Sequence, residues 1–320
     1  MTRQHYLPAT YLACFSKDSN SKRRERKLVV GDKRNGRIFI APASKMCREH
    51  DLYTLTDLNV SNMVDESWSY YEKKLATAID SLIQGTILAE AWADTLIPFV
   101  AGLLVRGDDF VKRFKTRLKK IKADTLSIAF SSDNINLARF IEFERMKSSI
   151  IGSKWRVSKV FGTDQLITND IGYTIFQDNT TKEFGIAVPM GLQHVLQIIP
   201  KQKKIVAIAR NEAWFPIIEY SYLHNRNHVQ LNQSIAGVGQ RFIFGSNRAF
   251  ISKYLEVDKQ PVQIPEPSDI GFMSGLMAMV HENTWARLIT KIAEKPKNDG
   301  DAIYIDYPKN FERYLKGHRR

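Results

Sequence analysis

Cysteine is scarce in this sequence, with only Cys14 and Cys47 among 320 residues. Two thiols cannot build a disulfide framework, and they cannot supply the four ligands of an all-cysteine zinc site. Long apolar runs are also missing, because residues 96–105 and 271–280 each reach about half of the ~20 residues that a membrane-spanning helix needs. The polar N-terminus contains no apolar core of a secretory signal. These absences predict a soluble, cytoplasmic protein with no membrane partner.

Negative charge is in short supply as well. The chain has 47 Lys and Arg against 34 Asp and Glu, which gives a net charge of +13. Such an excess favours polyanionic partners without identifying one. Much of the positive charge falls in three clusters, at residues 22–37, 112–122 and 316–320. We therefore expect nucleic acid as a partner, and a protein partner or a homo-oligomer is left open.

The common catalytic signatures are absent too. No P-loop is present, and Gly237-Val-Gly239 lacks the third glycine of a dinucleotide-binding loop. The segment after His281 has Trp285 where a zincin helix needs its second histidine. His224 and His228 have the spacing of a metal pair on one helix face, but no third ligand is evident, which favours a structural role.

The hydrophobic pattern predicts an α+β fold with an N-terminal hairpin and a helical bundle, a central, mostly antiparallel sheet, and C-terminal helices. Apolar runs at 27–30 and 37–40 flank a turn-rich segment, which indicates the hairpin. Helices are expected, from three- and four-residue periodicity, at 66–84, 89–106, 110–122, 134–150 and, with a break near Gly245, 212–251.

The same pattern suggests where the chain divides. Residues 1–255 are expected to form a single α+β domain, which is helical over 60–150, β-rich over 152–210 and helical over 211–255. Residues 256–320 begin with three prolines within seven positions, so they are expected to form a Pro-rich linker followed by a C-terminal helical extension.

The expected helix from Phe110 to Lys122 has the densest charge in the chain. An apolar stripe runs along it, and seven cations fill most of its remaining positions: Lys112, Arg113, Lys115, Arg117, Lys119, Lys120 and Lys122. Against a phosphate backbone these cations would release counterions and give salt-dependent, sequence-independent binding. The alternative is a solvated helix face that packs through its apolar stripe.

The N-terminal segment reads His5-Tyr-Leu-Pro-Ala-Thr-Tyr-Leu-Ala-Cys-Phe15. It resembles the start of a widespread prokaryotic family of unknown function, whose members begin His-Tyr-x-Pro-x-x-Tyr-Leu-x-x-Phe. Similar positions follow in order, with an acid at Glu72, an arginine that ends a helix at Arg106, and Thr168-Asn-Asp170 where the family has Thr-Ser-Asp. The resemblance spans about residues 4–250 and implies site residues without implying a reaction.

Four chemically capable side chains occupy matching positions: His5, Glu72, Arg106 and Asp170. As a catalytic set, His5 would be a general base or acid and Arg106 a phosphate clamp. Asp170 and Glu72 would then hold a divalent cation such as Mg²⁺ or orient His5. As a structural set, His5 and Tyr6 would bond to Glu72, and Arg106 would pair with Asp170. The sequence leaves both interpretations open.

The preferred hypothesis is a prokaryotic nucleic-acid-directed hydrolase, either a phosphodiesterase-type nuclease or a toxin-like effector of antiviral defence. The basic clusters and the four candidate site residues are its basis. The alternative is a non-catalytic nucleic-acid-binding or interaction module, such as a subunit of a defence complex. A third hypothesis is a sensor of nucleotides or other small molecules.

Overall fold

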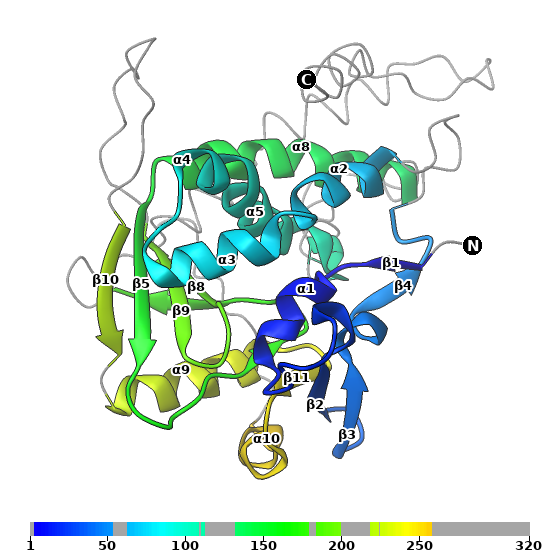
Figure 1. Cartoon of the computed structure of the whole chain (residues 1–320). Coiled ribbons are helices and arrows are strands. Elements are labelled where there is room, and N and C mark those ends of the chain that lie inside the picture. The colour runs from blue at the N-terminus through cyan, green and yellow to red at the C-terminus, as the bar shows by residue number, and fades with distance from the viewer. Residues whose placement is uncertain are drawn as a thin grey trace, which may run out of the picture.

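A computed structural model describes residues 3–53, 63–108, 110–112, 132–178, 184–199, 218–223 and 225–257. These residues form an α+β fold in which helices lie against mostly antiparallel sheets, as expected (Figure 1). In the described part of the chain, no helix has both the length and the apolar character needed to cross a membrane. The expected division of the chain near residue 255 stays a prediction, because the residues after 257 lie outside this part.

Helices and strands alternate along the chain, and most of the helices are short. The strands are β1 (Arg3–His5), β2 (Lys27–Asp32), β3 (Arg37–Pro42), β4 (Arg48–His50), β5 (Lys154–Val160), β6 (Thr168–Asn169), β7 (Thr174–Gln177), β8 (Phe184–Pro189), β9 (His194–Ile199), β10 (Ile218–Leu223) and β11 (Phe242–Gly245). The α-helices are α1 (Ala9–Leu12), α2 (Met63–Glu72), α3 (Leu75–Gln84), α4 (Ala89–Ala91), α5 (Ile97–Arg106), α8 (Ser132–Ile151), α9 (Asn225–Val238) and α10 (Arg248–Leu255). The shorter helices are η1 (Ala13–Phe15), η2 (Arg23–Glu25), η3 (Ala43–Lys45) and the π-helical η4 (Trp92–Leu96).

The expected hairpin is confirmed by the antiparallel pairing of β2 with β3, in which Val30 lies opposite Phe39. It belongs to a four-stranded sheet with the order β3-β2-β11-β6, which joins the N-terminal strands to a strand near residue 242. A separate two-stranded sheet pairs β1 with β4 and fixes the N-terminal arm, with His5 opposite Arg48.

The central sheet has five strands in the order β10-β5-β9-β8-β7. Its pairs are antiparallel except for β10, which runs parallel to β5. The expected helical character of residues 212–251 is therefore wrong at β10 and β11, although α9 and α10 are helical there. Tyr220 and Tyr222 alternate with polar neighbours, which is the strand period, and pairing with β5 makes this short segment an edge strand.

The helical region is more interrupted than its periodicity suggests. The helix expected over 66–84 is two helices that meet at Lys73 and Lys74, and Gly85 ends the second one in the left-handed conformation with φ 73°. The next helix continues from α4 to α5 through the π-helical turn η4. Because Pro98 has no backbone N–H to donate, it interrupts the regular hydrogen-bond ladder at this point.

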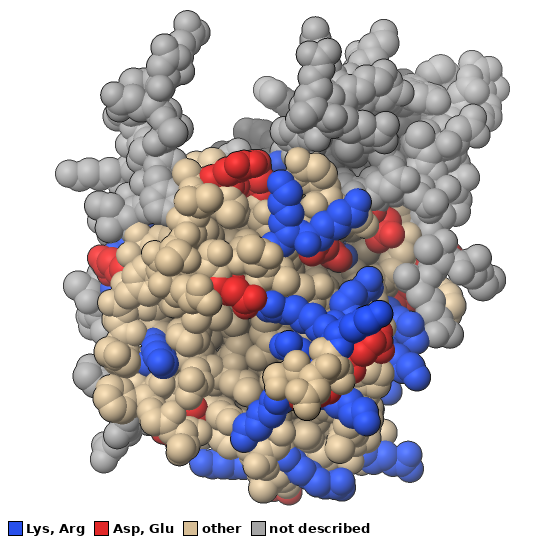
Figure 2. Space-filling model, in the orientation of Figure 1, with Lys and Arg blue, Asp and Glu red and all other residues tan. Residues whose placement is uncertain are grey.

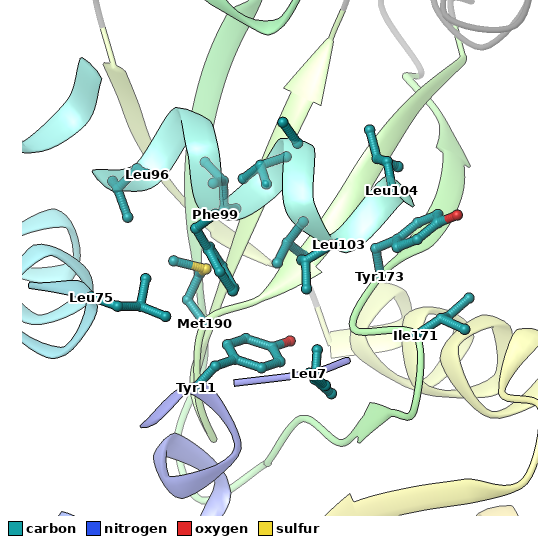
Figure 3. Packing of buried hydrophobic residues seen from close by; sticks show 14 of the residues in the cluster. Leu7, Tyr11, Leu75, Leu96, Phe99, Leu103, Leu104, Ile171, Tyr173 and Met190 are labelled. Carbon is teal, nitrogen blue, oxygen red and sulfur yellow. The ribbon is translucent and has the colours of Figure 1, made fainter. Parts of the chain in front are cut away.

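The core forms where α3 and α5 pack over the N-terminal segment and the central sheet (Figure 3). Tyr11 is fully buried there, with its ring 5.1 Å from that of Phe99. Its hydroxyl donates to the carbonyl of Gly172 at 3.1 Å and lies 3.0 Å from the Thr168 hydroxyl. The aromatic core of the N-terminal motif therefore holds the chain on both sides of Asp170.

Candidate functional site

Arg106 is the centre of the candidate site. It ends α5, and its side chain is only 2% exposed. Its guanidinium forms an ion pair with the Glu72 carboxylate and donates to the hydroxyls of Tyr71 and Tyr53, each at 3.3 Å. The remaining nitrogen, Nη2, donates to the backbone carbonyl of His5. Four segments of the chain, at the N-terminus, after β4, in α2 and in α5, are therefore tied together at one buried cation.

The surroundings keep this arginine charged. Burial is the largest single influence and would lower the pKa of Arg106, but Glu72 and the two tyrosines together raise that pKa well above its ordinary value. The guanidinium also lies 5.3 Å from the ring of Trp68 and 5.6 Å from that of Tyr53. Since every nitrogen already has a partner inside the protein, Arg106 is built to position its neighbours.

His5 is held in a defined orientation at the same place. Its Nδ1 lies 3.1 Å from the carbonyl of Met46, which can only accept, so Nδ1 bears the proton. Burial lowers the pKa of His5 to about 4; Glu72 opposes this shift, and the charges of Arg24 and Arg106 add to it. At neutral pH the imidazole is uncharged and Nε2 has a lone pair, but a pKa of about 4 makes it a weaker base than an ordinary histidine.

Asp170, unlike Glu72, is bonded to backbone amides. Its carboxylate accepts the backbone N–H groups of Gln240 at 2.8 Å, Arg241 at 2.7 Å and Phe242 at 3.1 Å. Burial raises the pKa of Asp170 although these three hydrogen bonds favour the charged form. The carboxylate fixes the turn before β11. Arg106 therefore pairs with Glu72 and not with Asp170, in contrast to the structural pairing considered from the sequence.

Asn169, directly before Asp170, fixes the backbone around this carboxylate through its side chain. The Asn169 side chain accepts the backbone N–H groups of Ile171 at 3.1 Å and Gly172 at 2.8 Å and donates to the carbonyl of Ile235 at 2.7 Å. Gly172 adopts a left-handed φ of 81°, which a residue with a side chain rarely takes. The turn after Asp170 therefore depends on the conformational freedom of glycine.

The structure thus brings three of the four candidate residues into direct contact. His5, Glu72 and Arg106 share one network, whereas Asp170 lies outside it and influences Tyr6 and Cys47 through its charge. Burial is the main cause that raises the pKa of Tyr6, and the neighbouring Cys47 thiol and Asp170 raise it further. The four residues surround the N-terminal arm, with Asp170 outside the shared network.

Sequence reasoning missed several members of this network. Tyr71 and Trp68 lie in the helix expected over 66–84, and no motif marks them as site residues. Met46 gave no signal and Arg24 gave only that of the basic cluster, because their roles here depend on a carbonyl and a charge that folding brings near His5. A second buried arginine, Arg139 in α8, lies 5.3 Å from the ring of Tyr53 and belongs to the same cluster.

The described residues give no further support to the metal sites considered from the sequence. No three His, Cys, Asp or Glu side chains gather there in a group that could hold a metal ion. Glu72 is bonded to Arg106, and Asp170 to three backbone amides, so the proposed Mg²⁺ role stays a prediction. His228 contacts Asp164 at 3.3 Å, and its partner in the spacing argument, His224, lies outside the described residues.

A basic surface lies beside this network. Figure 2 shows Lys and Arg side chains gathered over the part of the face where Figure 1 has α1, β2 and β3. Arg23 is neutralised by Asp80 at 2.8 Å. The other exposed cations of this N-terminal cluster are Lys22, Arg24, Lys27, Arg34 and Arg37. Because Arg24 influences the pKa of His5, the cluster reaches the candidate site.

The expected basic helix is described only at its start. The Lys112 ammonium donates to the side-chain carbonyl of Gln240 at 2.8 Å, next to the turn that Asp170 fixes. Its other six cations lie outside the described residues: Arg113, Lys115, Arg117, Lys119, Lys120 and Lys122. Their role in nucleic-acid binding stays a prediction.

Comparison with known proteins places the chain in a family. The family described as "Protein of unknown function (DUF4238)" matches residues 3–249, which is most of the chain. The protein therefore belongs to this family, and the expected membership in a family of unknown function is confirmed. No curated protein and no solved structure matches the chain.

Proposed function

We propose that this protein binds nucleic acid through the N-terminal basic cluster. The observation that carries the proposal is the exposure of Arg24, Arg34 and Arg37, none of which has an ion pair among the described residues. Unpaired surface cations on a chain of net charge +13 are free to replace the counterions of a phosphate backbone. The cations come from η2 and from the β2–β3 hairpin, two segments fixed by the sheet and by the Arg23–Asp80 pair.

The test is oligonucleotide binding over a range of salt concentrations. Replacing Arg24, Arg34 and Arg37 together by Gln is expected to weaken binding and to reduce the salt slope for a single strand by about 2, because each phosphate contact contributes roughly 0.7. Lys74→Gln removes an exposed cation outside the cluster and is the control. An unchanged salt slope in the triple variant would contradict the proposal. So would a wild-type protein that binds vesicles of anionic lipid but no oligonucleotide.

A second function, phosphodiester hydrolysis, is supported by the fixed orientation of His5. A neutral imidazole, held at Nδ1 by Met46, can accept a proton from water at Nε2, and Arg24 supplies positive charge nearby for a phosphate. The activated water would attack phosphorus, and the departing ribose or deoxyribose oxygen would take a proton from solvent. Glu72 and Arg106 would position His5 through its backbone.

The hydrolysis proposal is tested with His5→Asn, because an asparagine amide can still donate to the Met46 carbonyl. The variant should retain binding and lose cleavage of RNA or DNA, measured with and without Mg²⁺. The control, His50→Asn, removes an exposed histidine of β4. If the wild-type protein leaves every substrate intact, the hydrolysis proposal fails while the binding proposal stands.

A further inference from the structure

Three aromatic side chains form an exposed patch at one edge of the central sheet. Phe161 is 61% exposed, Tyr222 is 62% exposed and Tyr220 is 48% exposed. The rings of Phe161 and Tyr222 contact each other, with centroids 5.2 Å apart and planes inclined by 55°. Solvated aromatic rings in contact are costly to leave uncovered, so such a patch indicates an interaction site.

The strand register explains why these rings share one face. β10 is an edge strand in which Tyr220 lies opposite Val157 and Tyr222 opposite Lys159 of β5. Side chains two positions apart point to the same side of a sheet. Helix α3 covers one end of this face, where the Tyr220 hydroxyl donates to the carbonyl of Leu82 at 2.8 Å. Figure 1 shows β5 and β10 extending beyond α3, and at that end Phe161 and Tyr222 are more than half exposed.

The face of the patch includes one exposed cation. Lys159 is exposed and lies on the face of the two tyrosines, opposite Tyr222 and His194. The acidic residue of β10, Glu219, alternates to the other face and is bound there by Lys154 at 2.7 Å and by Arg156 at 3.4 Å. The aromatic face therefore presents a cation beside its rings, while its nearest strand carboxylate points away.

We propose that Phe161, Tyr220 and Tyr222 form a stacking platform for the unpaired bases of single-stranded nucleic acid, with Lys159 facing the backbone phosphates. This inference rests on the nucleic-acid-binding function proposed above and adds its substrate class. Two residues along a strand span about 6.6 Å, which is roughly twice the 3.4 Å between stacked nucleotides. Bases placed on both tyrosines must therefore be unstacked from each other, as a single strand allows and a duplex does not.

The test compares fluorescent oligo(dT), oligo(U) and a DNA duplex of equal length, by anisotropy. Tyr222→Ala and the double variant with Phe161→Ala should bind the single strands about 5- to 150-fold more weakly, the range expected for one lost stacked base. Duplex affinity and the salt slope should be unchanged, because no charge is removed. Tyr222→Phe retains the ring and should bind like the wild type, and Ile40→Ala, which trims an exposed apolar side chain on the other sheet, is the control.

Each outcome decides a different claim. If the wild type binds no oligonucleotide, both the binding function and the platform fail. If the wild type binds single strands and the aromatic variants bind them equally well, the platform alone is overturned. If the aromatic variants change self-association in sedimentation and leave oligonucleotide affinity unchanged, the patch is a protein interface and the inference is wrong.

Discussion

The ion pair between Glu72 and Arg106 allows the sharpest prediction. Glu72→Gln removes one charge while leaving an amide oxygen that can still accept from Arg106. Breaking a fully buried pair costs about 3–5 kcal/mol, because the remaining charge loses its partner. Glu72 is 26% exposed whereas Arg106 is 2% exposed, so water can partly compensate. We therefore expect a loss of about 2–3 kcal/mol in the free energy of unfolding.

The assay is urea denaturation, in which a lower midpoint at an unchanged m-value reports a loss of stability. Asp80→Asn is the matched control, because its pair with Arg23 is more exposed, at 53% and 22%, and should contribute only about 0–1 kcal/mol. In an Arg106→Met background the cost of Glu72→Gln should fall below about 0.5 kcal/mol, since the cation that pairs with Glu72 is gone. An equal cost in both backgrounds would refute the reasoning.

Three further predictions concern the same region. Tyr11→Phe should lower the unfolding free energy by about 1–3 kcal/mol, because the buried carbonyl of Gly172 loses its donor; denaturation that matches wild type would contradict it. Gly172→Ala should destabilise the protein more than Gly36→Ala does, as measured in thermal melts. Both glycines have a positive φ, so both substitutions strain the backbone. A Cβ at Gly172 would also lie within 3 Å of two leucine side chains, whereas a Cβ at Gly36 meets nothing within 4 Å. For His5, the folded pKa of about 4 lies below the unfolded value of 6.5, so the unfolded state binds more protons between these values. Stability should therefore rise by up to about 3 kcal/mol from pH 4 to 6.5, and His5→Asn should lack this part of the rise.

The parts of the fold that sequence patterns predicted are those with local causes. The β2–β3 hairpin follows from two short apolar runs around a turn, and α3 ends at Gly85 because glycine accepts the left-handed conformation. Residues 218–223 were misread as helical, although Tyr220 and Tyr222 alternate with polar neighbours at the strand period. Pairing with β5, about 60 residues earlier, made them a strand.

The candidate site likewise has a part that the sequence predicted and a part that only the structure shows. The family resemblance predicted His5, Glu72, Arg106 and Asp170 as site residues, and their place in family motifs stays a prediction. It did not supply their connections, and the pairing of Arg106 with Glu72 instead of Asp170 emerged only when α2 and α5 packed together. The role of Asp170 as an acceptor for three amides of the β11 turn also depends on residues some 70 positions later.

The sequence by itself determined the net charge of +13, the α+β class, the basic N-terminal cluster and the family. These properties depend on composition and on neighbours within a few residues. The tertiary structure decided that Arg106 is buried and bonded to the backbone of His5 and that His5 is neutral at pH 7. It also decided that three aromatic rings are exposed, two on β10 and one directly after β5. Desolvation, pKa and exposure depend on groups far apart in the chain, such as Arg106 and the carbonyl of His5, 101 residues away, which only folding brings together.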